Sequence, residues 1–162
     1  MSQKEITFNE NEFIISKTDS KGIITYCNEL FTEISGYTED ELFLKPHSIL
    51  RHPDMPKFIF QYLWDELRAG REVFAYVKNK TKNNDFYWVL AFVTPSLDNN
   101  GNLIEYFSVR RKPTQEAIAI IEPLYKQLLH EEKKAGINAS KLYLTNLLNT
   151  QGVSYEQFIF SV

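Results

Sequence analysis

The chain has 162 residues, of which 43% are hydrophobic and 24% are charged. These values fit one folded globular domain and exclude wholesale disorder. Eighteen Lys and Arg against 21 Asp and Glu give a net charge of -3, which argues against nucleic-acid binding. Cys27 is the lone cysteine, so no intramolecular disulfide can form. No signal-like start and no apolar run of about 20 residues occurs, so we expect a cytoplasmic protein without membrane insertion.

The first part of the chain predicts a hairpin followed by two short helices. Residues 13–18 and 23–27 are rich in strand-forming side chains, and the Asp-Ser-Lys-Gly segment 19–22 between them is a strong turn signal. Residues 28–36 have apolar positions at helical spacing and end on a glycine. The Thr-Glu-Asp-Glu segment 38–41 fits a capping box, which predicts the start of a second helix.

The middle of the chain predicts the longest helix of the domain and three further strands. Three prolines in residues 45–56 indicate turns or single helical turns. A wide apolar stripe predicts a helix over 57–69, which the following glycine ends. Residues 73–80, 86–94 and 102–111 are strand-like and separated by polar turns, so we expect an antiparallel meander.

This order predicts an α+β fold, in which short helices cover one face of a five-stranded antiparallel sheet. We divide the chain into an N-terminal extension (1–12), the sheet domain (13–113) and a C-terminal helical extension (114–162). In the last segment an amphipathic helix is expected to be interrupted or kinked at Pro123. Its apolar stripe should pack on its own sheet, on a second copy or on a partner. The stripe consists of Ile118, Ile121, Tyr125 and Leu128.

The sequence carries few signs of catalysis. The six glycines are scattered, no zinc-ligand spacing occurs, and no G-x-S-x-G motif is present. The remaining candidate is the proline-bracketed segment with Arg51, His52 and Asp54. Arg suits phosphate or carboxylate, and His titrates near neutrality, so a rigid loop could present them to a ligand. The alternative is structural, with Arg51 and Asp54 paired across a turn and His52 capping it.

Three other side chains have both a structural and a functional interpretation. Asn28 opens a helix and could cap it, or its amide could recognise a ring with donors and acceptors. Trp64 and Tyr87 could be core residues or could wall a flat aromatic cofactor.

Several of these segments resemble a known family. Asn28-Glu29-Leu30-Phe31, followed by residues 35–42, resembles the helical segment of PAS sensor domains. Residues 51–57, 77–79, 87–89 and 122–126 are more specifically similar to the PAS domain of bacterial aerotaxis receptors, and the resemblance covers about residues 13–128.

The resemblance implies non-covalent FAD binding and redox signalling to the chemotaxis machinery. The site positions that it implies are Asn28, Arg51, His52, Asp54, Trp64, Asn79 and Tyr87. This chain departs from the family at Val73, where the family has a tryptophan that walls the flavin pocket, and Val73 is expected to face that pocket. At the family's turn glycine this chain has Asn84, which also accepts the left-handed conformation.

The resemblance therefore implies a cytoplasmic sensor module, not an enzyme, that signals to a membrane-bound methyl-accepting chemotaxis-type transducer. A homodimer stays open, and the role of residues 130–162 is not given by the resemblance. Three rivals remain. The first is a haem-binding gas sensor with His52 as an axial ligand, the second a cofactor-free dimerisation or scaffold module, and the third a small flavin-dependent reductase.

Overall fold

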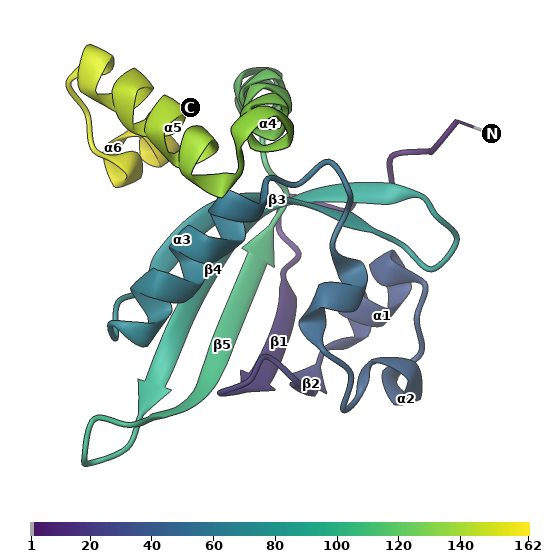
Figure 1. The fold of residues 1–162 in the computed structure, drawn as a ribbon. Helices are drawn as coiled ribbons and strands as arrows, with labels where there is room; N and C mark the ends of the chain where they lie inside the picture. The colour runs from purple at the N-terminus through teal and green to yellow at the C-terminus, as the bar shows by residue number, and fades with distance from the viewer. Residues whose placement is uncertain (1) are drawn as a thin grey trace.

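The computed structural model describes residues 2–162, which form a five-stranded antiparallel sheet with helices around it (Figure 1). The strands are β1 (Ile14–Asp19), β2 (Ile24–Cys27), β3 (Val73–Lys80), β4 (Phe86–Leu97) and β5 (Leu103–Arg111). The helices are α1 (Glu29–Ser35), α2 (Glu39–Leu42), the 3-10 helix η1 (His47–Leu50), α3 (Lys57–Arg68), α4 (Gln115–Ala135), α5 (Ile137–Gln151) and α6 (Tyr155–Ser161). The strand order is β2-β1-β5-β4-β3. The predicted α+β class is confirmed.

Local signals set the boundaries of the first elements. In the turn between β1 and β2, the Asp19 carboxylate accepts from the backbone amides of Lys21 at 2.8 Å and Ile23 at 3.0 Å. Gly22 adopts a left-handed φ of 82° there. The predicted capping box is present at α2, since the Thr38 and Glu41 side chains each accept from the other residue's backbone amide. These bonds satisfy amides that a helix start leaves free.

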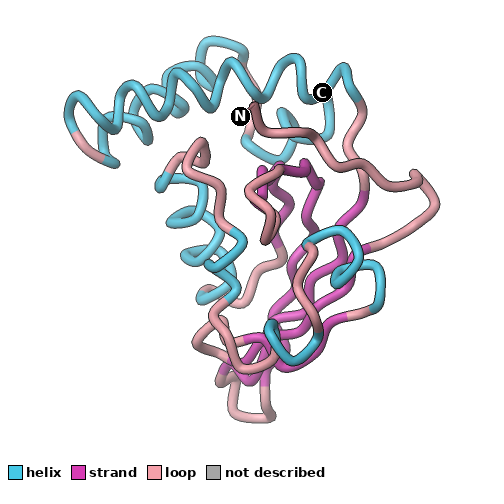
Figure 2. The backbone as a smooth tube through the Cα atoms, turned by 90° about the vertical axis from the view of Figure 1, so that its right-hand side faces the viewer, coloured by secondary structure: helices cyan, strands magenta, loops and turns pink. Residues whose placement is uncertain are grey.

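The sheet has an inner face, which α3 and η1 cover, and an opposite face. Neighbouring residues of a strand point to opposite faces. Val77 and Asn79 of β3 point to the inner face, as do their partners Val89 and Tyr87 of β4, because paired side chains share a face. Figure 2 shows α3 alongside the sheet, with the C-terminal helices crossing its upper end.

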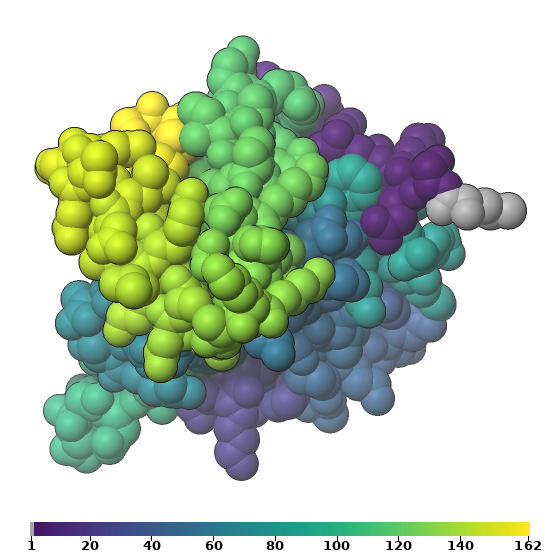
Figure 3. Space-filling model, turned by 45° about the horizontal axis from the view of Figure 1, so that its top comes forward, coloured from purple at the N-terminus to yellow at the C-terminus, as the bar shows by residue number. Residues whose placement is uncertain are grey.

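The C-terminal helices α4 to α6 lie at the β3 edge of the sheet, and in Figure 3 α4 and α5 pack side by side. All four residues of the predicted apolar stripe on α4 are buried. The Tyr125 hydroxyl donates to the carbonyl of Tyr76 at 2.6 Å, and the Tyr155 hydroxyl to that of Phe74 at 3.2 Å. The stripe is thus buried within this chain, where Tyr125 reaches the sheet and α4 packs along α5. Of the interruption or kink predicted at Pro123, the interruption is wrong, because α4 continues through the proline.

A carboxylate of α4 holds the beginning of α3. The residue before α3 is Pro56, which offers no side-chain cap. The Glu132 carboxylate instead accepts from the backbone amides of Lys57 at 3.0 Å and Phe58 at 2.9 Å. The Ser140 hydroxyl of α5 donates to the same carboxylate at 3.0 Å. The C-terminal helices therefore supply the N-terminal cap of α3, a helix of the sheet domain.

The N-terminal segment also joins the sheet. The backbone amide of Phe86 donates to the carbonyl of Lys4 at 3.0 Å, and Ile6 donates to the carbonyl of Phe86 at 2.7 Å. Among residues 2–162, no helix combines the length and the apolar character that crossing a membrane requires.

Candidate functional site

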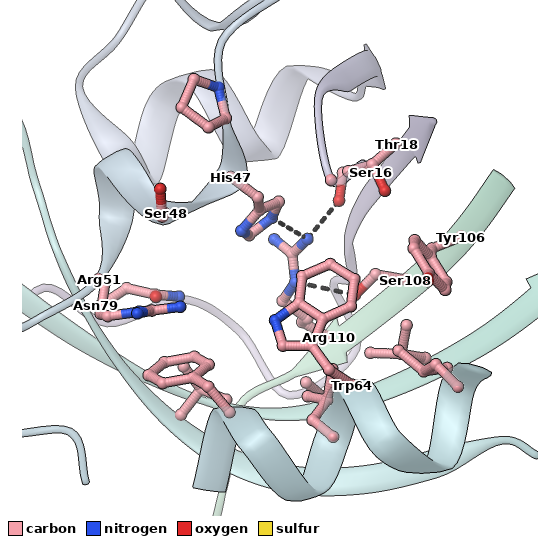
Figure 4. Close-up of a pocket in the computed structure, with 18 of the residues that line it drawn as sticks. Ser16, Thr18, His47, Ser48, Arg51, Trp64, Asn79, Tyr106, Ser108 and Arg110 are labelled. Carbon is pink, nitrogen blue, oxygen red and sulfur yellow. Dashed lines mark hydrogen bonds between the residues drawn. The ribbon is translucent and has the colours of Figure 1, made fainter. Parts of the chain in front are cut away.

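A cavity of about 160 Å³ lies between the inner face of the sheet, η1 and α3 (Figure 4). Its wall includes the aromatic rings of Phe60, Trp64 and Tyr106. Its cationic lining residues are Lys21, Arg51 and Arg110, and no Asp or Glu from the described part of the chain lines it. Hydrophobic walls with a few convergent polar groups are typical of small-molecule sites, and this set of charges favours an anionic ligand.

Three of the seven predicted site residues line this cavity, namely Arg51, Trp64 and Asn79. Arg51 is exposed, and its guanidinium carbon lies 3.8 Å from the centroid of the Phe60 ring. This stacking fixes the side chain at the cavity while leaving its N–H groups available, because a guanidinium donates in its own plane. Asn79 is buried, and a backbone bridge joins it to Arg51.

Trp64 reaches the cavity because the turn between β1 and β2 carries no side chain at Gly22. A Cβ at this position would lie 3.1 Å from the indole of Trp64, closer than ordinary van der Waals contact. The indole also packs edge-on against Tyr106, with 5.1 Å between ring centroids. The glycine thus serves both the left-handed turn and the close approach of the aromatic wall.

His52 and Asp54 do not line the cavity. The His52 ring is buried and accepts from the backbone amide of Asp54 at 3.0 Å, while its Nε2 lies 3.1 Å from the Gln3 side chain. Asp54 accepts from Lys78 Nζ at 2.7 Å, on the opposite face of β3 from Asn79. Burial and the nearby Lys78 ammonium lower the pKa of His52. These residues form a separate polar cluster, and the Arg51–Asp54 ion pair considered from the sequence is not formed.

Asn28 and Tyr87 also lie outside the lining of the cavity. The Asn28 side chain caps α1, accepting from the amides of Phe31 at 3.2 Å and Ile15 at 3.0 Å, and donates to the carbonyl of Phe13 at 2.8 Å. Tyr87 is fully buried on the inner face, and burial raises its pKa to about 12. Val73 is likewise buried on the inner face, opposite Val93, without lining the cavity.

The sequence interpretation missed Arg110 and His47, which both line the cavity. Arg110 follows Tyr106 and Ser108 at every second position of β5, so all three point to the cavity face. The sequence signal that could have identified Arg110 as a cavity residue is an arginine at an inward-facing position of a predicted strand. His47 stands at the start of η1, and its ring lies edge-on to Phe31.

A family model described as PAS fold matches residues 24–110. The chain therefore belongs to the PAS family, as the sequence resemblance predicted.

Among curated proteins, the chain is 41% identical to the aerotaxis receptor of Escherichia coli (strain K12) over 128 residues, which are 79% of this chain and 25% of the receptor. It is 31% identical over 93 residues to the biofilm dispersion protein BdlA of Pseudomonas aeruginosa, covering 54% of this chain and 21% of that protein. The chain thus spans about a quarter or less of these relatives. Among solved structures, the light state of the blue-light photoreceptor Aureochrome1 LOV matches with a TM-score of 0.58 at 21% identity, covering 77% of this chain and 92% of that chain. That match supports the fold.

Proposed function

We propose that this chain is a cytoplasmic PAS sensor module that binds FAD non-covalently and passes its redox state to a membrane-bound chemotaxis-type transducer. The observation that carries the proposal is the inner cavity, which combines aromatic walls with three cations and no acidic lining residue among residues 2–162. The 41% identity to an aerotaxis receptor supports the signalling role. Resident flavin would supply a ring that accepts and releases electrons.

The size of the cavity limits which part of FAD can enter it. Its volume of about 160 Å³ is below the roughly 300 Å³ at which sites for whole drug-sized ligands begin. The flat ring would occupy the interior beside Trp64, and the diphosphate would stay at the mouth. Arg51 and Lys21 are exposed there and line the cavity, and the arginine fork can form paired, charge-assisted bonds to phosphate oxygens.

Helix α3 connects the cavity with the C-terminal helices α4 to α6, through which the module would pass its signal to a partner. One side of the helix lines the cavity through Phe60 and Trp64. The other side packs on the C-terminal helices, since the ring centroids of Tyr62 on α3 and Tyr155 on α6 are 4.4 Å apart. A shift of α3 on reduction of the ring would therefore also act on α4 to α6, through the cap that Glu132 provides.

The visible absorption spectrum of the purified protein tests the proposal, followed by chromatography of the released cofactor. We expect flavin bands and FAD. A Soret band would favour the haem alternative, and a protein that neither retains nor takes up a chromophore would favour the cofactor-free scaffold. Haem ligation by His52 finds no support in the geometry, because this ring is outside the cavity lining and both its nitrogens have protein neighbours.

Arg51→Ala tests the anchor. The variant should lose most of its flavin during purification, and Arg51→Lys should recover only part, because a point charge lacks the planar fork. Wild-type flavin occupancy in Arg51→Ala would contradict the role given to Arg51.

A further inference from the structure

Arg110 is a buried cation inside the cavity with no acidic partner. Its side chain is 3% exposed. Among residues 2–162, no Asp or Glu forms an ion pair with it. Figure 4 shows its guanidinium directed toward His47 and Ser16.

The groups that hold Arg110 are neutral. Its Nε donates to Ser108 Oγ at 3.0 Å, and its Nη2 contacts Ser16 Oγ and lies 2.7 Å from His47 Nε2. Burial and the adjacent Arg110 cation lower the pKa of His47 well below its usual value. The neutral imidazole can therefore accept from Arg110, with its own proton on Nδ1.

The polar capacity of Arg110 is incompletely used. Its Nη1 is buried and has no hydrogen-bond partner in the described part of the chain. Its guanidinium carbon lies over the Phe31 ring, 5.0 Å from the ring centroid. Burial lowers its pKa to about 10, so the side chain stays charged at neutral pH. An uncompensated buried charge is costly to a fold, and a ligand that brings negative charge would remove much of this cost.

We propose that Arg110 binds the flavin ring in the cavity and neutralises the negative charge that the ring gains on reduction. This inference rests on the proposed function. It adds that Arg110 sets the relative affinity of the protein for oxidised and reduced FAD. On two-electron reduction to the anionic form, the ring takes up two electrons and one proton and gains one negative charge. In the test below, dithionite supplies the electrons and water supplies the proton. Arg51 differs from Arg110, because the diphosphate that it would hold is anionic in both forms.

The experiment titrates cofactor-free protein with FAD and, under anaerobic conditions, with dithionite-reduced FAD. The ratio of the two affinities is compared among wild type, Arg110→Gln, Arg110→Lys and the control Arg51→Gln. We expect wild type to bind reduced FAD more tightly. Arg110→Gln should reduce this preference by at least about tenfold, which corresponds to about 30 mV for a two-electron couple. Arg110→Lys should keep most of it, and Arg51→Gln should weaken both affinities while leaving their ratio unchanged.

The outcomes separate this proposal from the proposed function. Wild-type protein that binds neither form overturns the proposed function. Wild type that binds flavin but prefers the oxidised form overturns the role of Arg110 alone, and this measurement needs no variant to fold. The role of Arg110 is likewise overturned if Arg110→Gln has the same ratio of affinities for reduced and oxidised FAD as wild type. A reduced ratio in Arg110→Gln, restored in Arg110→Lys, supports the proposal.

Discussion

The carboxylate of Glu132 should stabilise α3 from 75 residues away in the sequence. Without it, the first turn of α3 would have no side-chain cap, because Pro56 precedes the helix. Glu132→Ala removes the acceptor for the amides of Lys57 and Phe58, which lie at 3.0 and 2.9 Å from the carboxylate. The Ser140 hydroxyl keeps an acceptor, since it also bonds to the carbonyl of Ile137.

The size of the effect follows from the worth of a helix cap. Loss of an N-terminal cap costs about 1 to 2 kcal/mol when water can replace part of it. For a chain of this size each kcal/mol lowers the thermal midpoint by about 2 to 4 °C, so we expect a decrease of about 2 to 8 °C. Glu132→Gln keeps one carbonyl oxygen and should lose about half as much. Thermal unfolding followed by circular dichroism measures both variants.

The control variant is Glu131→Ala, which removes the same charge from the adjacent position. Among residues 2–162, the Glu131 carboxylate accepts a hydrogen bond from Gln127 Nε2 of its own helix alone, at 2.9 Å, a pair worth about 0.2 to 0.5 kcal/mol. Hydrogen exchange supplies a local readout, because only Glu132→Ala should accelerate exchange at the amides of Lys57 and Phe58. Equal thermal midpoints for the two alanine variants, with unchanged exchange at these two amides, would refute the capping role.

Three further predictions concern the sheet and the cavity. Tyr125→Phe leaves the Tyr76 carbonyl without its 2.6 Å hydrogen bond, so the free energy of unfolding should fall by about 1 to 3 kcal/mol in denaturant titrations, whereas the exposed control Tyr143→Phe should leave it unchanged. Val73→Trp should lower the thermal midpoint, because Val73 is buried and overpacking costs about 1 to 3 kcal/mol. It should not tighten flavin binding, because Val73 is not among the residues that line the cavity. Tighter flavin binding at an unchanged thermal midpoint would disprove this prediction. His47 has a pKa well below its usual value when folded, so the unfolded chain binds more protons below about pH 6.5 and stability should fall there by up to about 1.4 kcal/mol per pH unit. His47→Gln should flatten this decline between pH 7 and 5.5, and an equally steep curve would count against the assignment.

Most elements of the fold could be predicted because their signals are local. The Asp-Ser-Lys-Gly turn, the capping box at Thr38 and the apolar stripe of α4 each act over a few residues. Pro123 does not interrupt α4, because the apolar stripe is buried on both sides of the proline. The cap that Glu132 provides joins α4 to the start of α3, which lies far away in the sequence, so no local sequence pattern predicts it.

The candidate site was predicted in part for a similar reason. The sequence predicts a ligand-presenting segment that begins at Arg51, but consecutive residues of a turning backbone point in different directions. Arg51 lines the cavity, whereas His52 and Asp54 point to a cluster around Lys78. Arg110 was overlooked because its meaning depends on what surrounds it. A buried position without an acidic neighbour is a property of the assembled sheet.

Several backbone groups of the two outer strands, β3 and β2, already have partners within the chain. Along β3, the carbonyls of Phe74 and Tyr76 accept from tyrosine hydroxyls, and the amide of Lys78 contacts the sulfur of Met55. Along β2, Ile24 exchanges backbone hydrogen bonds with the segment that follows α2. Recognition by strand addition requires a row of free amides and carbonyls, so an added strand would have to displace these contacts. A partner that binds this domain without displacing these contacts would recognise exposed side chains, so substitutions that change its affinity are expected at such side chains.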